Sequence, residues 1–242
     1  MKALSIIIPS FNDEDKVEKK IFQLVEKLKK IIIRFEIIII NDGSTDNTLK
    51  NLKNIKFSKK NIKIINNNKN YGKSFSIRKG LRIAKYNHII LIDSDLPYFD
   101  KLKIVIEKLK QNYDFVFINR RHKKSEIINK KLNFYQTSRI FIGFLVSHIV
   151  KLFLNFYIYG GDTQSGLKGF KKVKNFNKLK FISTKFFLDL EIMYIYNKLN
   201  MKFYSIPVKY KIDEKSSIKL FSIKKNSEIL VELIRVIFNL KR

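Results

Sequence analysis

The stretch HIILIDSDLPY, residues His88–Tyr98, sets a run of apolar side chains directly before two aspartates that one serine separates. A continuous apolar run that ends in polar residues is typical of a strand buried on both faces of a parallel sheet. Two carboxylates at the end of such a strand repel each other, and burying them is costly unless a positive charge joins them. The chain must therefore supply or bind a cation beside Asp93 and Asp95.

Outward from this stretch, apolar runs and amphipathic segments alternate through the first half of the chain. The pattern predicts strands at 4–10, 35–44, 61–68, 88–95 and 114–121 and helices at 13–30, 44–54, 72–86 and 99–111, with Ser44 and Thr45 as caps of the second helix. Such alternation is typical of an α/β fold with a mostly parallel, Rossmann-like sheet flanked by helices. Ligands of these sheets bind beyond the carboxyl ends of the strands. We therefore expect one shared rim for the polar residues that follow the strands, namely 10–13, 41–42, 66–70, 93–95 and 119–120.

The composition bounds the class of protein. The 242 residues, 45% of them hydrophobic, suit one large domain with a proper core and argue against disorder. Cysteine is absent, which excludes disulfides and thiolate metal sites and is consistent with a reducing compartment. The apolar run near the N-terminus predicts the first strand rather than a signal peptide. The formal net charge of +29 has two explanations: a composition biased toward Lys, Asn and Ile, or an anionic partner such as a membrane surface, nucleic acid or phosphorylated substrate.

The second half is less regular and contains two long segments that mix apolar and basic residues. Residues 139–160 are strongly apolar but include His148 and Lys151, whereas a membrane-spanning helix needs about 20 largely uncharged residues. We therefore expect an amphipathic helix, or a helix pair, that lies on a membrane or packs on the domain. Residues 220–242 have apolar positions at helical spacing and predict an interfacial or core-packing helix. The predicted organisation is a domain of residues 1–220 followed by a C-terminal amphipathic helix at 221–242.

Asp93 and Asp95 point to the same side of an extended segment because they stand at positions i and i+2. Two carboxylates without a thiolate suit a hard cation such as Mg²⁺ or Mn²⁺, although the pair can also consist of a helix cap and a solvated aspartate. Asp13 and Asp42 can accept hydrogen bonds from a nucleoside or act as helix caps. Lys73 follows a glycine at a predicted helix start, and a helix N-terminus with a lysine attracts phosphate. Together these rim residues favour a nucleotide ligand.

Four blocks of the first half resemble one family when they are taken in order and at their spacing. SIIIPSFND, IIIINDGSTDNT, NYGKSFSIRKG and IILIDSDL look like the motifs of family-2 glycosyltransferases with the GT-A fold. Further along, GGDTQSGLKGF and FFLDLEIMYIYNKLNMKFYSIPVKY are similar to blocks of the dolichyl- and polyprenyl-phosphate glucosyltransferases and their mannosyl relatives, and INRR falls where those enzymes have G-S-R. The resemblance covers residues 4–125 strongly and extends to about residue 220. It implies a GT-A glycosyltransferase domain at residues 1–220, with a nucleotide-binding half at 1–125 and an acceptor half at 126–220.

The resemblance implies an inverting transfer of a hexose from a nucleotide sugar, most often UDP-glucose or GDP-mannose. The donor nucleotide would contact Pro9, Phe11, Asp13, Asp42, Lys73, Asp93 and Ser94. Asp93 and Asp95 would hold Mg²⁺ or Mn²⁺ against the diphosphate, where the ion assists departure of the nucleotide as a Lewis acid and gives Asp95 a catalytic role. The acceptor would be a polyprenyl phosphate at an anionic membrane surface, with its phosphate bound by Arg120, Arg139, Lys168 and Lys219.

The acceptor decides whether a general base is needed. A phosphate monoester has its second pKa at about 6 and is largely dianionic at neutral pH, so it is already a nucleophile. A sugar hydroxyl would need a base. Asp162 is the candidate for that role, and the alternative is a structural hydrogen bond within its loop. Asp189 and Glu191 lie in an apolar, helix-like run and can either bind the loop that carries Lys168 or orient the acceptor.

The sequence departs from the family pattern in some places. Pro97 stands where the mannosyl relatives often have a glutamine, which removes a candidate third metal ligand. No clear pair of C-terminal membrane spans is present, so we expect a peripheral protein on the cytoplasmic face of the membrane, or one held there by a separate membrane-anchoring protein. Two alternatives stay open: transfer to a saccharide acceptor in surface polysaccharide synthesis, and a non-catalytic basic binding module. We expect no specific nucleic-acid partner, because the aspartate pair would repel phosphates in the absence of a metal.

Overall fold

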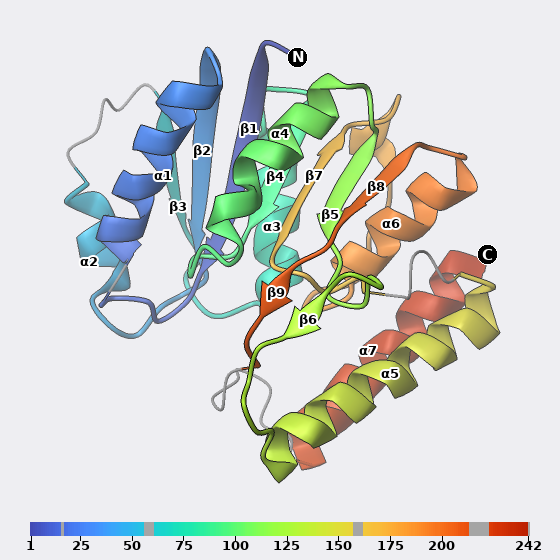
Figure 1. Cartoon of the computed structure of the whole chain (residues 1–242). Coiled ribbons are helices and arrows are strands. Elements are labelled where there is room, and N and C mark those ends of the chain that lie inside the picture. Colours follow the sequence, from blue (N-terminus) through green and yellow to red (C-terminus); the bar gives the residue numbers. More distant parts are fainter. Residues whose placement is uncertain (16, 56–60, 157–161, 213–222, 242) are drawn as a thin grey trace.

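The computed structural model describes residues 1–15, 17–55, 61–156, 162–212 and 223–241. Within these residues a mixed seven-stranded sheet of order β3-β2-β1-β4-β7-β5-β8 forms the centre of the molecule, with helices on both faces (Figure 1). Its strands are β1 (Ala3–Ser10), β2 (Arg34–Asn41), β3 (Ile62–Asn66), β4 (His88–Ile92), β5 (Phe115–Ile118), β7 (Leu167–Lys171) and β8 (Phe203–Ile206). Neighbouring strands pair in parallel, except that β7 runs antiparallel to β4 and β5. A separate parallel pair joins β6 (Glu126–Ile127) to β9 (Lys209–Tyr210).

The helices divide the core into two apolar layers, one on each face of the sheet. They are α1 (Val17–Ile31), α2 (Thr48–Lys53), α3 (Lys73–Ile83), α4 (Leu102–Lys110), α5 (Phe134–Leu154), α6 (Leu188–Lys198) and α7 (Ile223–Lys241), with 3-10 turns η1 (Phe99–Lys101) and η3 (Phe176–Lys178). Buried side chains of α1, α2 and α4 form one layer, and those of α3, α5, α6 and α7 form the other. Ile6 and Ile8 of β1 belong to the first layer and Ile7 to the second. This strand is apolar without alternation because both of its faces are covered.

The predicted α/β order is confirmed for the first half, where each predicted strand and helix is present with its ends shifted by a few residues. The central strand β7 was not predicted, because Lys168 and Gly169 interrupt its apolar pattern. Lys168 is buried in an ion pair, and a Cβ atom at Gly169 would lie 2.8 Å from a methyl group of Val105. The glycine thus allows α4 to pack closely on β7. The burial of a lysine depends on a distant partner, which a local pattern does not reveal.

The predicted caps of the second helix are wrong. α2 begins after Asn47, whose side chain makes no capping hydrogen bond with the described residues. Oγ of Ser44 instead donates to Oδ1 of Asn41 at 2.5 Å, and the backbone amide of Thr45 donates to Oδ1 of Asn12 at 2.9 Å. The loop between β2 and α2 is therefore bound to the loop after β1, and the two loops together form part of the rim.

The two long segments of the second half form the helices α5 and α7, which lie side by side (Figure 1). α5 is a single helix that begins at a capping box made by Asn133 and Gln136. By length and composition alone α5 is apolar enough to cross a membrane, with a mean hydropathy of 1.5 over a window of which 17% is buried. α7 contributes Leu233, Val236 and Ile237 to the second core layer. Both helices therefore pack on the domain and leave much of α5 exposed.

Gly80 marks the point where α3 crosses the sheet. A Cβ atom at this position would lie 2.6 Å from Cγ2 of Ile7 and 2.9 Å from Cδ1 of Ile40. Gly80→Val is therefore expected to lower the free energy of unfolding by about 1–3 kcal/mol through overpacking. Urea denaturation would measure the change. Gly143→Val is the control, because a Cβ atom there meets only the tip of Arg121, and an equal loss in both variants would contradict the prediction.

Candidate active site

The carboxyl ends of β1, β2, β3 and β4 meet at one edge of the sheet, as the alternating pattern predicts. Ser10 of β1 pairs with Asn41 of β2, which in turn pairs with Asn66 of β3. The antiparallel strand β7 starts at the same edge, and the backbone amide of Asp93 donates to the carbonyl of Gly166 at 3.0 Å. A Cβ atom at Gly166 would lie 2.9 Å from Oδ2 of Asp93. The glycine thus leaves the space that the carboxylate occupies.

The cation beside the aspartate pair is a lysine of the chain itself. Nζ of Lys73 lies 2.6 Å from Oδ1 of Asp93, and each of the two side chains is 34% exposed. Burial lowers the pKa of Lys73, but the charges of Asp93 and Asp189 outweigh it and hold that pKa above its ordinary value. Partial desolvation, followed by the charge of Asp93, raises the pKa of Asp95. Lys73 thus reaches the predicted diphosphate site already paired with a carboxylate.

A second ion pair lies deeper than the first. Nζ of Lys168 lies 2.6 Å from Oδ2 of Asp189, both side chains are almost fully buried, and burial lowers the pKa of Lys168. Oδ1 of Asp189 and Oγ of Ser165 are buried without a hydrogen-bond partner in the described part of the chain. Both residues line a cavity of about 10 Å³, roughly the space of one water molecule.

This burial decides between the predicted roles of the second pair. A direct contact between Lys168 and an acceptor phosphate is not supported, because its ammonium is covered and already neutralised. Of the two alternatives for Asp189, the structure shows that it binds the segment carrying Lys168. Glu191 binds a different backbone segment: its carboxylate accepts hydrogen bonds of 2.9 and 3.1 Å from the amides of Ile182 and Ser183.

The N-terminus of α3 is closed by the loop that precedes α6. The backbone amides of Ser74 and Phe75 donate to the carbonyls of Lys185 and Thr184 at 3.1 and 2.8 Å. Protein carbonyls occupy these two amides, so they are not available to a phosphate. What α3 offers a phosphate is the side chain of Lys73.

Asp42 is buried at the end of β2 and uses both carboxylate oxygens within the protein. Oδ1 accepts from Nδ2 of Asn67 at 2.8 Å and from the amide of Tyr71 at 3.1 Å, and Oδ2 accepts from the amide of Gly72 at 2.8 Å. These bonds hold the loop that delivers Lys73 to the rim. A carboxylate has about four acceptor positions, so Asp42 can still receive a hydrogen bond from a nucleoside.

The end of β1 and the loop after it also contain buried polar atoms that no described residue pairs. Oδ2 of Asp13 and Oγ of Ser10 are buried and have no hydrogen-bond partner among the described residues. Pro9 lines the small cavity at the ion pairs, Phe11 is 45% exposed, and Ser94 stands between the two aspartates. Leaving buried oxygens unpaired costs free energy, which donor groups of a nucleoside would recover.

Arg120 follows β5 and is clamped by the buried carboxylate of Asp162. Nε of Arg120 donates to Oδ2 at 2.9 Å, Nη2 donates to Oδ1 at 2.6 Å, and the backbone amide of Arg120 donates to Oδ2 at 2.8 Å. Burial raises the pKa of Asp162, but Arg120 outweighs it and holds that pKa below its ordinary range. A carboxylate with a lowered pKa is a weak base near pH 7, which favours the structural alternative for Asp162. The Arg120 side chain stays 33% exposed, so its other N–H groups can receive a phosphate.

The structure adds Arg121, which the sequence reasoning missed. Its guanidinium donates to a serine hydroxyl of α5 and lies 4.8 Å from the centre of the Phe144 ring, so it fastens α5 to the end of β5. The two adjacent arginines of INRR could have pointed to Arg121, but the sequence does not tell which of them faces the rim. Arg139 lies near the start of α5, and Lys219 lies outside the described residues, as does the predicted domain boundary at residue 220.

A divalent cation would find hard oxygen ligands at this rim. The described residues contain no group of three or more His, Asp or Glu side chains close enough to hold a metal. Asp93 and Asp95 would therefore supply part of a coordination shell, with diphosphate oxygens and water in the other positions, as is usual for Mg²⁺. Nζ of Lys73 contacts Oδ1 of Asp93, which shows that this carboxylate attracts a cation. The residues present fit Mg²⁺ or Mn²⁺.

Comparison with known proteins points to one family. Residues 5–165 match the family model described as Glycosyl transferase family 2. An uncharacterised glycosyltransferase of Synechocystis is 40% identical over 124 residues, which cover 51% of this chain and 39% of that protein, so the chain spans well under half the length of this relative. The dolichyl-phosphate beta-glucosyltransferase of Dictyostelium discoideum is 24% identical over 251 residues, which cover 97% of this chain and 74% of that protein.

A solved structure agrees with the fold. The glucosyl-3-phosphoglycerate synthase of Mycobacterium tuberculosis, in complex with Mn²⁺, UDP-glucose and phosphoglyceric acid, superposes with a TM-score of 0.65 and 12% sequence identity. The match covers 98% of this chain and 80% of that one. At this identity the likeness shows the fold, and it confirms the predicted GT-A-like α/β architecture.

Proposed function

This chain belongs to glycosyltransferase family 2, and from that premise we propose that it transfers a hexose from a nucleotide sugar, UDP-glucose or GDP-mannose, to a polyprenyl phosphate at a membrane surface. Similarity to a dolichyl-phosphate beta-glucosyltransferase along nearly the whole chain supports this acceptor class. The observation that carries the proposal is the clamped guanidinium of Arg120. A guanidinium fixed by a buried carboxylate is a preorganised receptor for phosphate oxygens, because its remaining N–H groups keep a planar fork.

The donor would lie along the first half of the rim. Asp13 and Asp42 stand at the nucleoside end, and Lys73 with the aspartate pair stands at the diphosphate end. A divalent ion, when bound, would be held by Asp93 and Asp95 and would neutralise charge on the leaving nucleotide. Lys73 adds a second positive charge at the same place, which stabilises the charge that develops as the nucleotide departs.

The proposed transfer needs no proton removal. An acceptor phosphate oxygen forms a bond to the anomeric carbon while the bond from that carbon to the donor diphosphate breaks, and its electron pair leaves with the nucleotide. Attack on the face opposite the leaving group inverts the configuration. The acceptor phosphate is largely dianionic above a pH of about 6, so it attacks without a general base. The lowered pKa of Asp162 agrees with this reaction, because Asp162 would then position Arg120.

The exposed side of the helix pair supports a membrane location. The α5–α7 face is defined by residues that are 44–79% exposed: Phe134, Phe141, Leu145, Leu152 and Phe153 of α5 and Leu230, Val231, Ile234 and Phe238 of α7. Exposed apolar side chains on two adjacent helices make this helix pair a candidate interaction surface. We propose that this face rests on the cytoplasmic leaflet, where the surplus of lysines is attracted to anionic lipids at about 1 kcal/mol each. Arg121 fastens α5 beside Arg120, which would bring a lipid-linked phosphate to the rim.

Charging the α5–α7 face should release the protein from membranes. Phe141→Asp combined with Phe238→Asp is expected to weaken binding to vesicles that contain anionic lipid by at least about tenfold, since burying each aromatic ring contributes roughly 1.5–3 kcal/mol. Vesicle flotation would measure the bound fraction. Phe22→Asp on α1, where the phenylalanine is 52% exposed, is the matched control. An equal loss of vesicle binding in Phe22→Asp would contradict the proposal that the α5–α7 face contacts the membrane.

A transfer panel tests the function itself. Purified protein with Mn²⁺ or Mg²⁺ would receive UDP-glucose, UDP-galactose, UDP-N-acetylglucosamine or GDP-mannose, each with and without a polyprenyl phosphate. Release of nucleotide that depends on the lipid is the expected result, and it identifies the sugar. Donor binding that depends on the metal, without turnover on the lipid, would favour a saccharide acceptor. Absence of donor binding in every mixture would overturn the proposed activity.

A further inference from the structure

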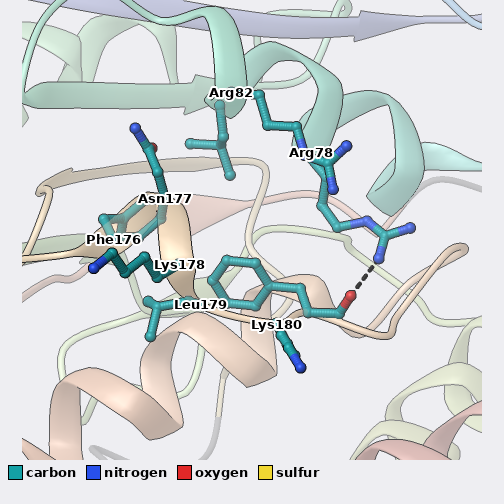
Figure 2. Close-up of a pocket in the computed structure, with 9 residues that line it drawn as sticks. Arg78, Arg82, Phe176, Asn177, Lys178, Leu179 and Lys180 are labelled. Atoms are coloured by element: carbon teal, nitrogen blue, oxygen red, sulfur yellow. Dashed lines mark hydrogen bonds between the residues drawn. The ribbon is translucent and has the colours of Figure 1, made fainter.

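A second cavity, of about 270 Å³, lies between α3 and the segment that follows β7 (Figure 2). Its walls are Arg78, Leu81 and Arg82 of α3 and the residues Phe176–Phe181. Within the described part of the chain, none of these residues lines the small cavity at the ion pairs. The second cavity is therefore separate from the candidate active site, although α3 contributes to both.

The lining of this cavity combines apolar side chains with positive charges. The apolar side chains are those of Leu81, Phe176, Leu179 and Phe181, and the positive ones are those of Arg78, Arg82, Lys178 and Lys180. No aspartate or glutamate is among the nine described residues that line it. A concave, partly apolar site with cations and without carboxylates at its wall fits a small organic anion.

Two arginines make the site more specific than a collection of surface lysines. Arg78 and Arg82 stand one turn apart on α3, and Figure 2 shows both side chains extending toward the same end of the cavity. Lys180 points away from the cavity in this view, so the arginines carry the argument. Burial, and then the charge of Arg82, lower the pKa of Arg78, whereas the carboxylates of Glu191 and Glu232 act in the opposite direction. An anion between the two arginines would relieve their mutual repulsion.

Arg78 and Arg82 keep N–H groups that can donate hydrogen bonds to a ligand in the cavity. One N–H of Arg78 donates to the carbonyl of Phe181, which fixes the side chain and leaves its other N–H groups. Arg82 is exposed and makes no ion pair with a carboxylate among the residues described. Two guanidinium forks side by side offer the planar, multidentate contact that phosphate oxygens accept best.

We propose that this cavity binds a small molecule that carries a phosphate group. The phosphate lies between Arg78 and Arg82, and the body of the molecule packs against Leu81, Phe176 and Phe181. A volume of about 270 Å³ approaches the lower end of the range for ligand pockets, about 300 Å³, and suits a sugar phosphate or a nucleoside monophosphate. A soluble phosphate ester and a lipid headgroup share this chemistry, and the test separates them.

Calorimetric titration of the full chain at physiological salt tests the proposal. The probes are inorganic phosphate, a hexose phosphate, a nucleoside monophosphate and vesicles that contain phosphatidic acid. Saturable binding of one phosphate ester per chain is expected, and Arg82→Ala is expected to weaken it by at least about tenfold through loss of one charge-assisted hydrogen-bonding group. Arg34→Ala is the matched control, because Arg34 is an exposed arginine of β2 and its loss removes the same charge. Arg34→Ala should change the affinity by less than about twofold, because an exposed charge away from the cavity contributes little.

Three results would overturn the proposal. The first is absence of saturable binding with every probe. The second is equal weakening by Arg82→Ala and Arg34→Ala, which would reduce the binding to general attraction by the basic chain. The third is loss of the binding in Lys73→Met with Arg82→Ala unchanged, which would assign the phosphate to the candidate active site. If only the vesicles bind, and this binding depends on Arg82, the phosphate site is supported and its ligand is a lipid headgroup.

Discussion

Asp95→Asn is expected to lower the rate of sugar transfer by about 10²–10³-fold, the usual loss when a group that stabilises charge in the transition state is removed. Asp95 keeps its shape as asparagine but loses the charge that would hold a divalent ion at the diphosphate. Asp93→Asn should cause a comparable loss and also leaves Lys73 without the carboxylate that lies 2.6 Å from its ammonium. Steady-state rates at saturating donor would measure both variants.

Metal binding provides an independent measurement of the same prediction. Titration with Mn²⁺, followed by electron paramagnetic resonance of the free ion in the presence of donor, should show weaker binding in both variants. Asp100→Asn is the matched control, since Asp100 is an exposed aspartate of the following turn that pairs with Lys101. Full activity in Asp95→Asn, or an equal loss in Asp100→Asn, would contradict the assigned role of the pair.

Asp162→Asn is expected to reduce kcat/KM for the polyprenyl phosphate by about 10–100-fold and to leave the dissociation constant of the donor unchanged. An effect of roughly 1.5–3 kcal/mol corresponds to loss of one charge-assisted hydrogen bond that orients Arg120. Arg120→Lys should fall in the same range, because lysine keeps the charge but lacks the fork. Arg34→Lys, at an exposed position of β2, is the surface control.

The pH dependence separates a positioning residue from a general base. Arg120 holds the pKa of Asp162 below its ordinary range, so Asp162 is ionised throughout the neutral range and its titration does not shape activity there. The acidic limb of the wild-type profile should then reflect the acceptor phosphate, with a midpoint of about 6, and should persist in Asp162→Asn. Disappearance of that limb in the variant, with activity independent of pH, would restore Asp162 as a base.

The fold could be predicted in the first half because the signals are local. Two stretches, IIIINDGS and IILIDSD, each combine an apolar run with polar residues at the strand end. This local pattern predicts the strand, its burial on both faces and the end that lies at the rim. β7 could not be predicted in this way. The local pattern of its segment LKGFK is that of a polar loop. The segment can be a buried strand because Asp189 neutralises Lys168 and α4 packs on Gly169.

The sequence predicted which residues lie at the candidate site better than it predicted the contacts that these residues make. The sequence placed Asp93, Asp95 and Asp42 at strand ends, and the structure brings those strand ends to one edge of the sheet. The predicted extended segment through Asp95 is wrong, because β4 ends at Ile92 and the amide of Leu96 donates to the carbonyl of Asp93 to close a turn. The sequence also suggested that the start of α3, together with Lys73, would attract phosphate, whereas the loop before α6 covers two backbone amides there. That loop lies about a hundred residues downstream, and its approach also depends on Gly72, where a Cβ atom would lie 2.7 Å from the carbonyl oxygen of Thr184.

The sequence by itself determined the α/β class, the family, the rim and the residue types available there, because periodicity and strand ends depend on neighbouring residues. Only the tertiary structure decided which charges meet. Lys73 neutralises Asp93, and Asp162 clamps Arg120 across a separation of 42 residues. Such pairings follow from the order of strands in the sheet, where segments distant in the chain become neighbours and burial makes an unpaired charge too costly to keep.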